Sequence, residues 1–178
     1  MNQEKGQSPL YREVQRFRQV WLWVVVSAIT GMQWLAAVEQ LLLNKPFGEN
    51  PMKDIPMAIY WFIFGIGLPA LLFFSQLITE VRDDGIYIRF SPFHRTFRRI
   101  AYPKIKQCAV QTYRPIRDYG GWGIRIRCKR KAYNVSGNRG VQIELLNGNR
   151  LLIGSGRADE LWRAIQAKLG EQEDWNFS

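Results

Sequence analysis

The sequence predicts a membrane-spanning helical hairpin joined to a small all-β domain that a C-terminal helix caps. Two uncharged stretches, residues 19–38 and 55–79, are each long enough to cross a bilayer, because about 20 apolar residues span its hydrocarbon core. Beyond Thr79, apolar residues alternate with polar ones between turn dipeptides, a pattern typical of short strands. The apolar residues near the C-terminus instead recur with a helical period.

These patterns divide the chain into six segments. We expect an N-terminal juxtamembrane segment (1–18), a first transmembrane helix (19–43), an external loop (44–55), a second transmembrane helix (56–79), a β-domain (80–170) and an acidic tail (171–178). The first apolar stretch starts late and lacks a small-residue cleavage site, so it is expected to be retained rather than removed as a signal peptide.

The N-terminal segment carries a helical pattern of its own. Leu10, Val14, Phe17 and Trp21 recur at the spacing of one helix face. We therefore expect the first helix to begin near Pro9, with its early turns at the level of the lipid headgroups.

The two spans are expected to pack against each other. Small or polar residues interrupt the first span at Ser27, Thr30, Gly31 and Gln33. Such residues favour helix contact in a bilayer. In the second span Gly65, Gly67 and Pro69 permit close approach and a kink.

The charge distribution predicts the orientation. From Glu80 onward the chain carries 19 of its 25 Lys and Arg residues but 10 of its 15 Asp and Glu residues. Because basic flanks stay preferentially on the cytoplasmic side, we expect both termini in the cytoplasm of a bacterial inner (plasma-type) or equivalent membrane. The reverse orientation is the less favoured alternative. Cys108 and Cys128 then face a reducing compartment and are expected to be free thiols.

Turn signals and alternation define the expected strands. Asp84-Gly85 and Asn147-Gly148 each predict a β-hairpin. In the segment between them, Trp122, Ile124 and Ile126 alternate with a glycine and then basic residues, which predicts a half-buried strand with Trp122 in the core. About seven antiparallel strands are expected in all.

The last helix is expected to cover this sheet. Ala158, Leu161, Trp162, Ile165 and Leu169 share one of its faces. Its first turn is acidic, which suits the positive end of a helix dipole. The pattern predicts a bent sheet or open barrel capped by this helix.

The β-segment resembles the bacterial pleckstrin-homology-like (PH-like) domains. The resemblance rests on the runs GWGIR at 121–125, AYNVSG at 132–137, GVQIEL at 140–145 and the stretch from Asn147-Gly148 to Leu161. It covers residues 80–169 and implies a PH-like fold, often found after a two-helix membrane hairpin. It also implies a binding or assembly module, and it transfers no functional residue.

Catalytic and metal chemistry find little support in the sequence. His94 is the single histidine and lies in a strand connection without a nucleophile partner. The run Gly154-Ser155-Gly156 is interpreted as a turn and a helix start rather than a phosphate loop, because acidic residues follow it. Two cysteines and one histidine cannot complete a structural zinc site. We expect no catalytic site, no cofactor and no metal.

The candidate binding residues are cationic. One cluster lies in and after the basic strand, and a second lies near residue 98. The candidates are Arg125, Arg127, Lys129, Arg130, Lys131, Arg98 and Arg99. Close to an anionic leaflet each basic residue contributes about 1 kcal/mol of attraction. The cluster is expected to act as one electrostatic surface.

These features predict a non-enzymatic, membrane-anchored scaffold, assembly or regulatory subunit of a membrane complex. Recognition of anionic lipid headgroups by the basic domain is the alternative. Contact with an acidic protein partner and ordinary solvated positive charge are the other two interpretations of the clusters. An enzyme or transporter subunit whose chemistry lies on another chain stays open. Nucleic acid is disfavoured as a partner because the positive-inside rule already accounts for the charge.

Overall fold

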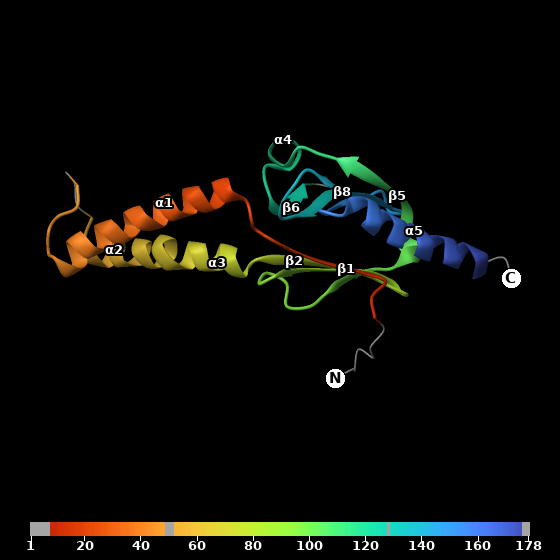
Figure 1. The fold of residues 1–178 in the computed structure, drawn as a ribbon, viewed down its shortest axis with the longest axis horizontal. Coiled ribbons are helices and arrows are strands. Elements are labelled where there is room, and N and C mark those ends of the chain that lie inside the picture. Colours follow the sequence, from red (N-terminus) through yellow and green to blue (C-terminus); the bar gives the residue numbers. More distant parts are fainter. Residues whose placement is uncertain (1–7, 49–51, 128, 176–178) are drawn as a thin grey trace. The chain divides into compact units, whose positions relative to one another are not determined.

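The structure is a computed structural model of the chain, and it describes residues 8–48, 52–127 and 129–175. It contains two compact units. Phe17–Ser75 form a helical hairpin, whereas Met1–Arg16 together with Gln76–Ser178 form a unit of strands and one long helix (Figure 1). The hairpin is therefore an insertion between two segments of the β-unit, so the expected domain of residues 80–170 lacks its first strand.

The hairpin consists of two long apolar helices. Its first arm contains α1 (Val20–Ala37) and a π-helical turn at Val38–Leu42. Its second arm contains α2 (Asp54–Tyr60), a π-helical turn at Trp61–Gly67 and α3 (Leu68–Phe74). The arms, of 23 and 21 residues, are long and apolar enough to cross a membrane. This confirms the two predicted apolar helices.

Pro69 explains why the second arm departs from an α-helix. Proline has no backbone N–H, so the carbonyl of Gly65, four residues earlier, loses its α-helical donor. The Trp34 indole Nε1 donates to that carbonyl at 3.2 Å. One turn away, Thr30 Oγ1 donates to the Phe64 carbonyl at 3.4 Å. The expected packing at Thr30 and Gly65 is confirmed. At Gly31, no described heavy atom outside the adjoining helix backbone lies within 4 Å of the Cβ position, so no close contact is formed there.

Both expected helix boundaries near the β-unit are wrong. The N-terminal segment forms the strand β1 (Tyr11–Arg16), and the first helix starts at Val20 instead of near Pro9. The second arm ends at Phe74, and β2 (Gln76–Arg82) begins two residues later rather than after residue 79. The end of the second helix was predicted too late because the uncharged stretch continues into β2, whose apolar residues are buried within the β-unit.

Strand β1 belongs to a four-stranded antiparallel sheet. Its order is β1-β2-β3-β4, with β3 at Gly85–Ser91 and β4 at Arg98–Ile100. The β2–β3 pair is the hairpin predicted at Asp84-Gly85, but Arg82 pairs with Gly85, so the two turn residues are Asp83 and Asp84. Arg16 pairs with Gln76. The two chain segments that lead into the helical hairpin therefore lie side by side at one end of this sheet.

A second sheet has five strands in the order β5-β8-β9-β7-β6. A 3₁₀ turn at Tyr102–Lys104 leads into it, and its elements are β5 (Ile105–Thr112), α4 (Pro115–Tyr119), β6 (Gly123–Arg127), β7 (Arg130–Asn134), β8 (Arg139–Leu145) and β9 (Arg150–Gly154). The Asn147-Gly148 hairpin is confirmed by the β8–β9 pair. Strands β7 and β9, however, are parallel. The described strands, nine in two sheets, differ from the expected seven antiparallel strands and do not close into a barrel.

Helix α5 (Ala158–Trp175) contacts both sheets. Its buried side chains are Ala158, Leu161 and Ile165, which confirms the predicted face. The side chains at or below 2% exposure come from both sheets and from α5. The helix also includes residues 171–175, which were expected to be a loose tail; residues 176–178 lie outside the described part.

Strand β6 is an edge strand rather than a core strand. It pairs with β7 alone, and Ile126 is 65% exposed. Trp122 and Ile124 are half-buried. The prediction that Trp122 belongs to the core is wrong, because alternation within a strand reports two faces but not the position of that strand in its sheet.

Candidate functional site

The structure distributes the predicted basic residues over three strands and a turn. Arg125 and Arg127 belong to the edge strand β6, Lys129 to the following turn, Arg130 and Lys131 to β7, and Arg98 and Arg99 to β4. Each of these side chains that the structure describes is exposed; the side chain of Arg127 and all of Cys128 lie outside the described part. The guanidinium of Arg125 lies against Gly121, whose Cβ position is 2.9 Å from Arg125 Nη2.

Arg130 and Lys131 do not contribute to one surface. Successive residues of a strand point to opposite faces of the sheet. Arg130 lines a cavity of about 450 Å³, whereas Lys131 lines a separate cavity of about 190 Å³. The five residues from Arg125 to Lys131 thus form at least two surfaces, which departs from the single electrostatic surface expected. Whether any of these residues binds a partner stays a prediction.

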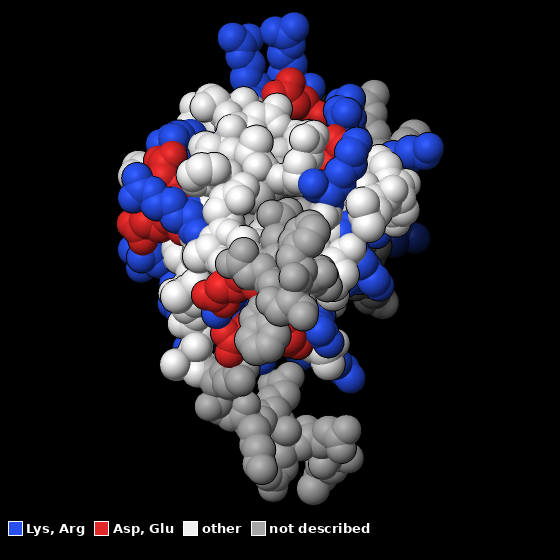
Figure 2. Space-filling view, turned by 90° about the vertical axis from the view of Figure 1, so that its right-hand side faces the viewer, with Lys and Arg blue, Asp and Glu red and all other residues white. Residues whose placement is uncertain are grey.

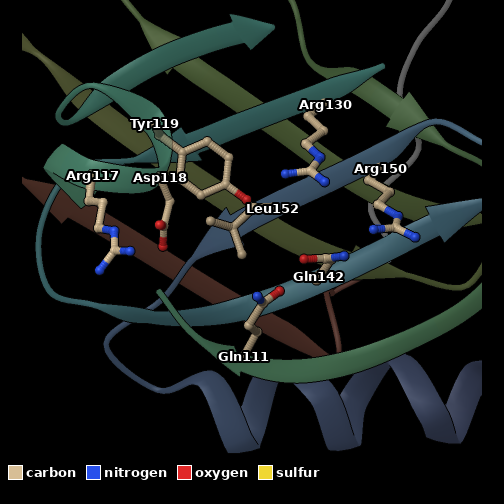
Figure 3. Close-up of a pocket in the computed structure, with 8 residues that line it drawn as sticks. All are labelled: Gln111, Arg117, Asp118, Tyr119, Arg130, Gln142, Arg150 and Leu152. Atoms are coloured by element: carbon tan, nitrogen blue, oxygen red, sulfur yellow. The ribbon is translucent and has the colours of Figure 1, made fainter. Parts of the chain in front are cut away.

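The larger cavity, called here the arginine cavity, lies on the face of the five-stranded sheet opposite α5 (Figure 3). The α4 segment supplies one wall, and strands β5, β8, β9 and β7 supply the rest. It is lined by Gln111, Arg117, Asp118, Tyr119, Arg130, Gln142, Arg150 and Leu152. Figure 3 shows Arg117 on one side and Arg130 with Arg150 on the other.

The local sequence explains how α4 covers this face. Gly120 ends α4 in the left-handed conformation, with φ of 72°, and its N–H donates to the Ile116 carbonyl at 2.9 Å. Glycine adopts this conformation without strain. The Tyr119 ring then packs against the buried cluster of Tyr113, Ala132 and Leu152. This apolar contact holds α4 beside the cavity.

Three guanidinium groups dominate the electrostatics of the arginine cavity. Arg130 and Arg150 are register partners in the parallel β7–β9 pair, and like charges placed directly opposite are destabilising. Arg150 lies 4.0 Å from the Glu144 carboxylate, which also binds Lys106 at 3.1 Å. Among the described residues, neither Arg117 nor Arg130 forms an ion pair.

The two other ionisable groups of the cavity, Asp118 and Tyr119, offset only part of this charge. Asp118 Oδ2 accepts the backbone N–H of Arg114 at 2.8 Å, which holds its carboxylate at the start of α4. Burial raises the pKa of Tyr119, and nearby Arg130 opposes that rise. Tyr119 therefore stays a neutral hydroxyl at physiological pH. The lining residues carry three positive charges and one negative charge.

The smaller cavity, called here the inter-sheet cavity, joins the two basic clusters that are separate in the sequence. Arg98 and Arg99 from β4 line it together with Lys131 and Arg150. Two of these groups already have polar partners. Arg99 forms an ion pair with Asp84 at 3.0 Å, and Arg98 Nη1 donates to the Tyr133 hydroxyl at 3.3 Å.

In the described part of the face shown in Figure 2, charged side chains of both signs lie around an area of uncharged residues. The positive excess of the chain does not gather into one continuous patch there.

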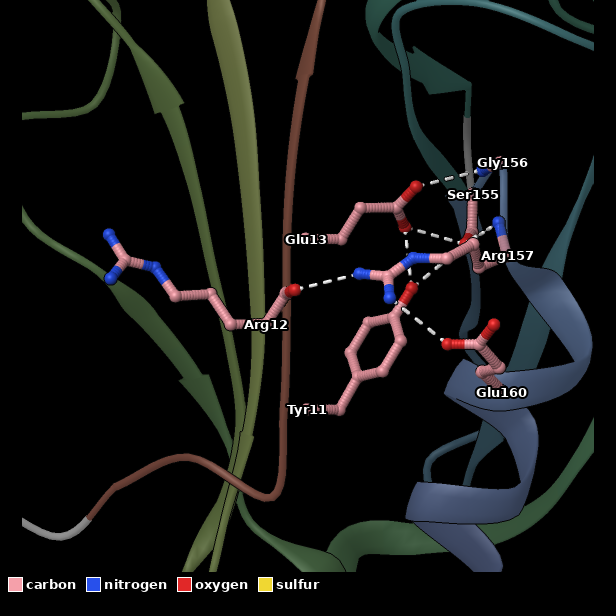
Figure 4. Close-up of polar contacts among 7 residues, drawn as sticks. All are labelled: Tyr11, Arg12, Glu13, Ser155, Gly156, Arg157 and Glu160. Atoms are coloured by element: carbon pink, nitrogen blue, oxygen red, sulfur yellow. Dashed lines mark hydrogen bonds and ion pairs between the residues drawn. The ribbon is translucent and has the colours of Figure 1, made fainter.

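A buried polar network at the start of α5 explains the Gly154-Ser155-Gly156 run (Figure 4). Glu13 Oε1 accepts the Gly156 N–H at 3.0 Å, and Glu13 Oε2 accepts the Ser155 hydroxyl at 2.6 Å. Ser155 Oγ in turn accepts the Arg157 N–H at 3.0 Å. The interpretation as a turn and helix start agrees with this geometry, because a carboxylate of β1 already occupies the position near these donors.

The remaining reactive side chains pack against neighbours. His94 Nδ1 accepts the Phe90 N–H at 3.4 Å, and its ring lies 5.8 Å from that of Tyr133. Burial, followed by the charge of Arg98, lowers the pKa of His94. Cys108 is buried, which raises the pKa of its thiol. Within the described residues, no group of three His, Cys, Asp or Glu side chains could hold a metal ion.

Sequence reasoning missed most of the arginine cavity. Arg117 lies in the short helix α4 and Arg150 follows a turn, so neither belongs to a basic run of the sequence. Only the parallel pairing of β7 with β9 sets Arg150 beside Arg130. A parallel neighbour that comes later in the chain leaves no mark in local periodicity.

Comparison with known proteins gives a family but no activity. A search of curated proteins finds no match. The model of the family described as "Family of unknown function (DUF6141)" matches residues 2–171, which is nearly the whole chain. The protein therefore belongs to the DUF6141 family.

Proposed function

We propose that the protein is a non-enzymatic, membrane-anchored module that scaffolds or regulates a larger membrane assembly. The helical hairpin crosses a bacterial inner or equivalent membrane twice, and both termini with the β-unit lie in the cytoplasm. The charge bias after residue 80 supports this orientation. The two sheets and the C-terminal helix of the β-unit support the PH-like part of this proposal, although the parallel β7–β9 pair departs from the expected antiparallel pattern.

The observation that carries this proposal is the exposed edge strand β6. It has a strand partner on one side only, and an edge strand offers backbone hydrogen-bonding groups to an added strand. Ile126 is 65% exposed on it, next to the exposed Arg125. An apolar side chain flanked by cations favours an extended, acidic segment of a protein partner.

The test is copurification of the full-length protein in mild, uncharged detergent. We expect Ile126→Asp to remove stoichiometric protein partners, since it puts a like charge against an acidic segment. Leu146→Asp is the matched control, because Leu146 is 67% exposed in the β8–β9 turn. Partners lost from the Ile126 variant alone support the proposal. Equal retention by both variants contradicts it.

Contact with anionic lipid headgroups is the second candidate function. The inter-sheet cavity favours it, because Arg98 and Arg99 of β4 meet Lys131 of β7 there, although the two strands are far apart in the chain. Replacing these three residues by Gln should weaken retention of anionic phospholipid by the purified protein, with a strong dependence on salt. Phospholipid retention that changes neither with salt nor with these substitutions would exclude this role.

A further inference from the structure

We propose that the arginine cavity is a binding site for a small ligand bearing a phosphate group, held between Arg117 of α4 and the Arg130–Arg150 pair. This site goes beyond the membrane and partner contacts proposed above. It does not include Ile126 of β6, and it shares only Arg150 with the inter-sheet cavity, so variants of Arg117 and Arg130 test it independently of both earlier proposals.

The charge of the cavity matches a phosphomonoester. Three arginines and one aspartate line it, which leaves an excess of two positive charges. A phosphomonoester carries about −1.5 to −2 at neutral pH. An anion placed between Arg130 and Arg150 would relieve the repulsion that their register imposes.

The available donors match the shape of the group. Guanidinium groups bind phosphate oxygens through paired N–H donors. Arg117 and Arg130 have no ion-pair partner among the described residues. The amides of Gln111 and Gln142 and the neutral hydroxyl of Tyr119 add donors around the same space. Leu152 and the Tyr119 ring provide an apolar surface for the rest of the ligand.

The size of the cavity selects a small molecule. Its volume of about 450 Å³ lies within the range of roughly 300–1,000 Å³ that is usual for small-molecule sites. Five structural elements surround it, so a flat protein surface would not reach the three guanidinium groups together (Figure 3). The phosphate group could belong to a free metabolite or to a lipid, and the experiment separates these sources.

The experiment is titration calorimetry of the full-length protein in an uncharged, phosphate-free detergent. The two probes are glycerol 3-phosphate and short-chain dihexanoyl phosphatidic acid, which offer the same group free and on a lipid. We expect saturable binding of at least one probe. The double variant Arg130→Gln/Arg150→Gln should weaken it by about 10-fold or more, because it removes two charge-assisted contacts.

Two further variants make the outcome decisive. Arg117→Gln should also weaken binding, although its side chain comes from a different element. Arg163→Gln removes an exposed arginine of α5, on the other side of the sheet, and should leave binding within about 2-fold. Tighter binding of the lipid probe identifies a lipid headgroup, and binding of glycerol 3-phosphate at least as tight identifies a free phosphomonoester. Absence of binding by both probes, or equal binding by all variants, overturns the proposal.

Discussion

The buried carboxylate of Glu13 allows the strongest test of the fold. It accepts hydrogen bonds from the Tyr11 hydroxyl at 2.7 Å, the Ser155 hydroxyl at 2.6 Å and the Gly156 N–H at 3.0 Å (Figure 4). Glu13 is 9% exposed. In Glu13→Gln the remaining oxygen can still accept the Gly156 N–H, but the new amide faces two hydroxyl groups that had been donors.

The expected cost follows from those two contacts. Hydrogen bonds to a charged group contribute about 1.5–3 kcal/mol each, and part of this returns because a neutral amide is cheaper to bury. We expect the substitution to destabilise the docking of β1 by about 2–4 kcal/mol. If β1 detaches locally, exchange of its amide hydrogens should accelerate by roughly 30- to 700-fold.

The assay is hydrogen exchange of the full-length protein in detergent, read by mass spectrometry over residues 10–18. Glu160→Gln is the control, because that side chain is 57% exposed and pairs with Arg157 at the surface. Its effect should stay within about 0.5 kcal/mol. Equal exchange in both variants would refute the docked strand and would favour the helix that the Leu10–Val14 spacing predicts.

Three other outcomes are expected. The single histidine gives one imidazole signal, and its NMR titration should have a midpoint below about 6.5, because burial lowers the pKa of His94. The stability that neutral His94 contributes is therefore present above about pH 6.5 and declines as the pH falls. His94→Gln should remove this part of the pH dependence of stability. A titration midpoint above about 6.5 would contradict the packing of His94. Trp34→Phe should lower the stability of the hairpin by about 0.6–1.5 kcal/mol, because it removes the hydrogen bond to the Gly65 carbonyl. Trp61→Phe is the control and should cost less, since the Trp61 Nε1 has no hydrogen-bond partner among the described residues. An equal loss of stability would show that ring packing alone matters. A cysteine at Lys45, in a background without native cysteines, should react with an impermeant reagent from outside intact cells, and protection of this site would reverse the proposed topology.

The sequence predicted an element correctly wherever the pattern of neighbouring residues agrees with how that element packs in the structure. The apolar arms of the hairpin were predictable because about 20 apolar residues in succession have few alternatives to a membrane or a core. The β8–β9 hairpin was predictable because Gly148 has a left-handed φ of 77°, which favours glycine. The β2–β3 hairpin was predicted one residue too late, because its turn residues are Asp83 and Asp84 and Gly85 already belongs to β3. The buried face of α5 followed from a regular helical period.

Strand β1 shows where local reasoning failed. Tyr11, Glu13 and Gln15 point inward, whereas Val14 is 46% exposed. Polar side chains of β1 thus face the interior and apolar ones face outward, which reverses the usual pattern of a strand. The arrangement is stable because buried polar groups have hydrogen-bond partners more than 130 residues away. Gln15 Nε2, for example, donates to the Gly154 carbonyl at 2.7 Å. No local window contains those partners, so the apolar residues left on the outside imitated a helix.

The candidate site divides in the same way. The sequence by itself determined that the chain carries two membrane-length apolar arms, a strand-rich segment and an excess of positive charge, since each is a property of neighbouring residues. Tertiary structure alone decided which charges meet. The parallel β7–β9 register sets Arg130 beside Arg150, the α4 turn adds Arg117, and the alternation of a strand separates Lys131 from its neighbour. Charge count is fixed by composition, but the convergence of charge depends on strand order, which long-range packing selects.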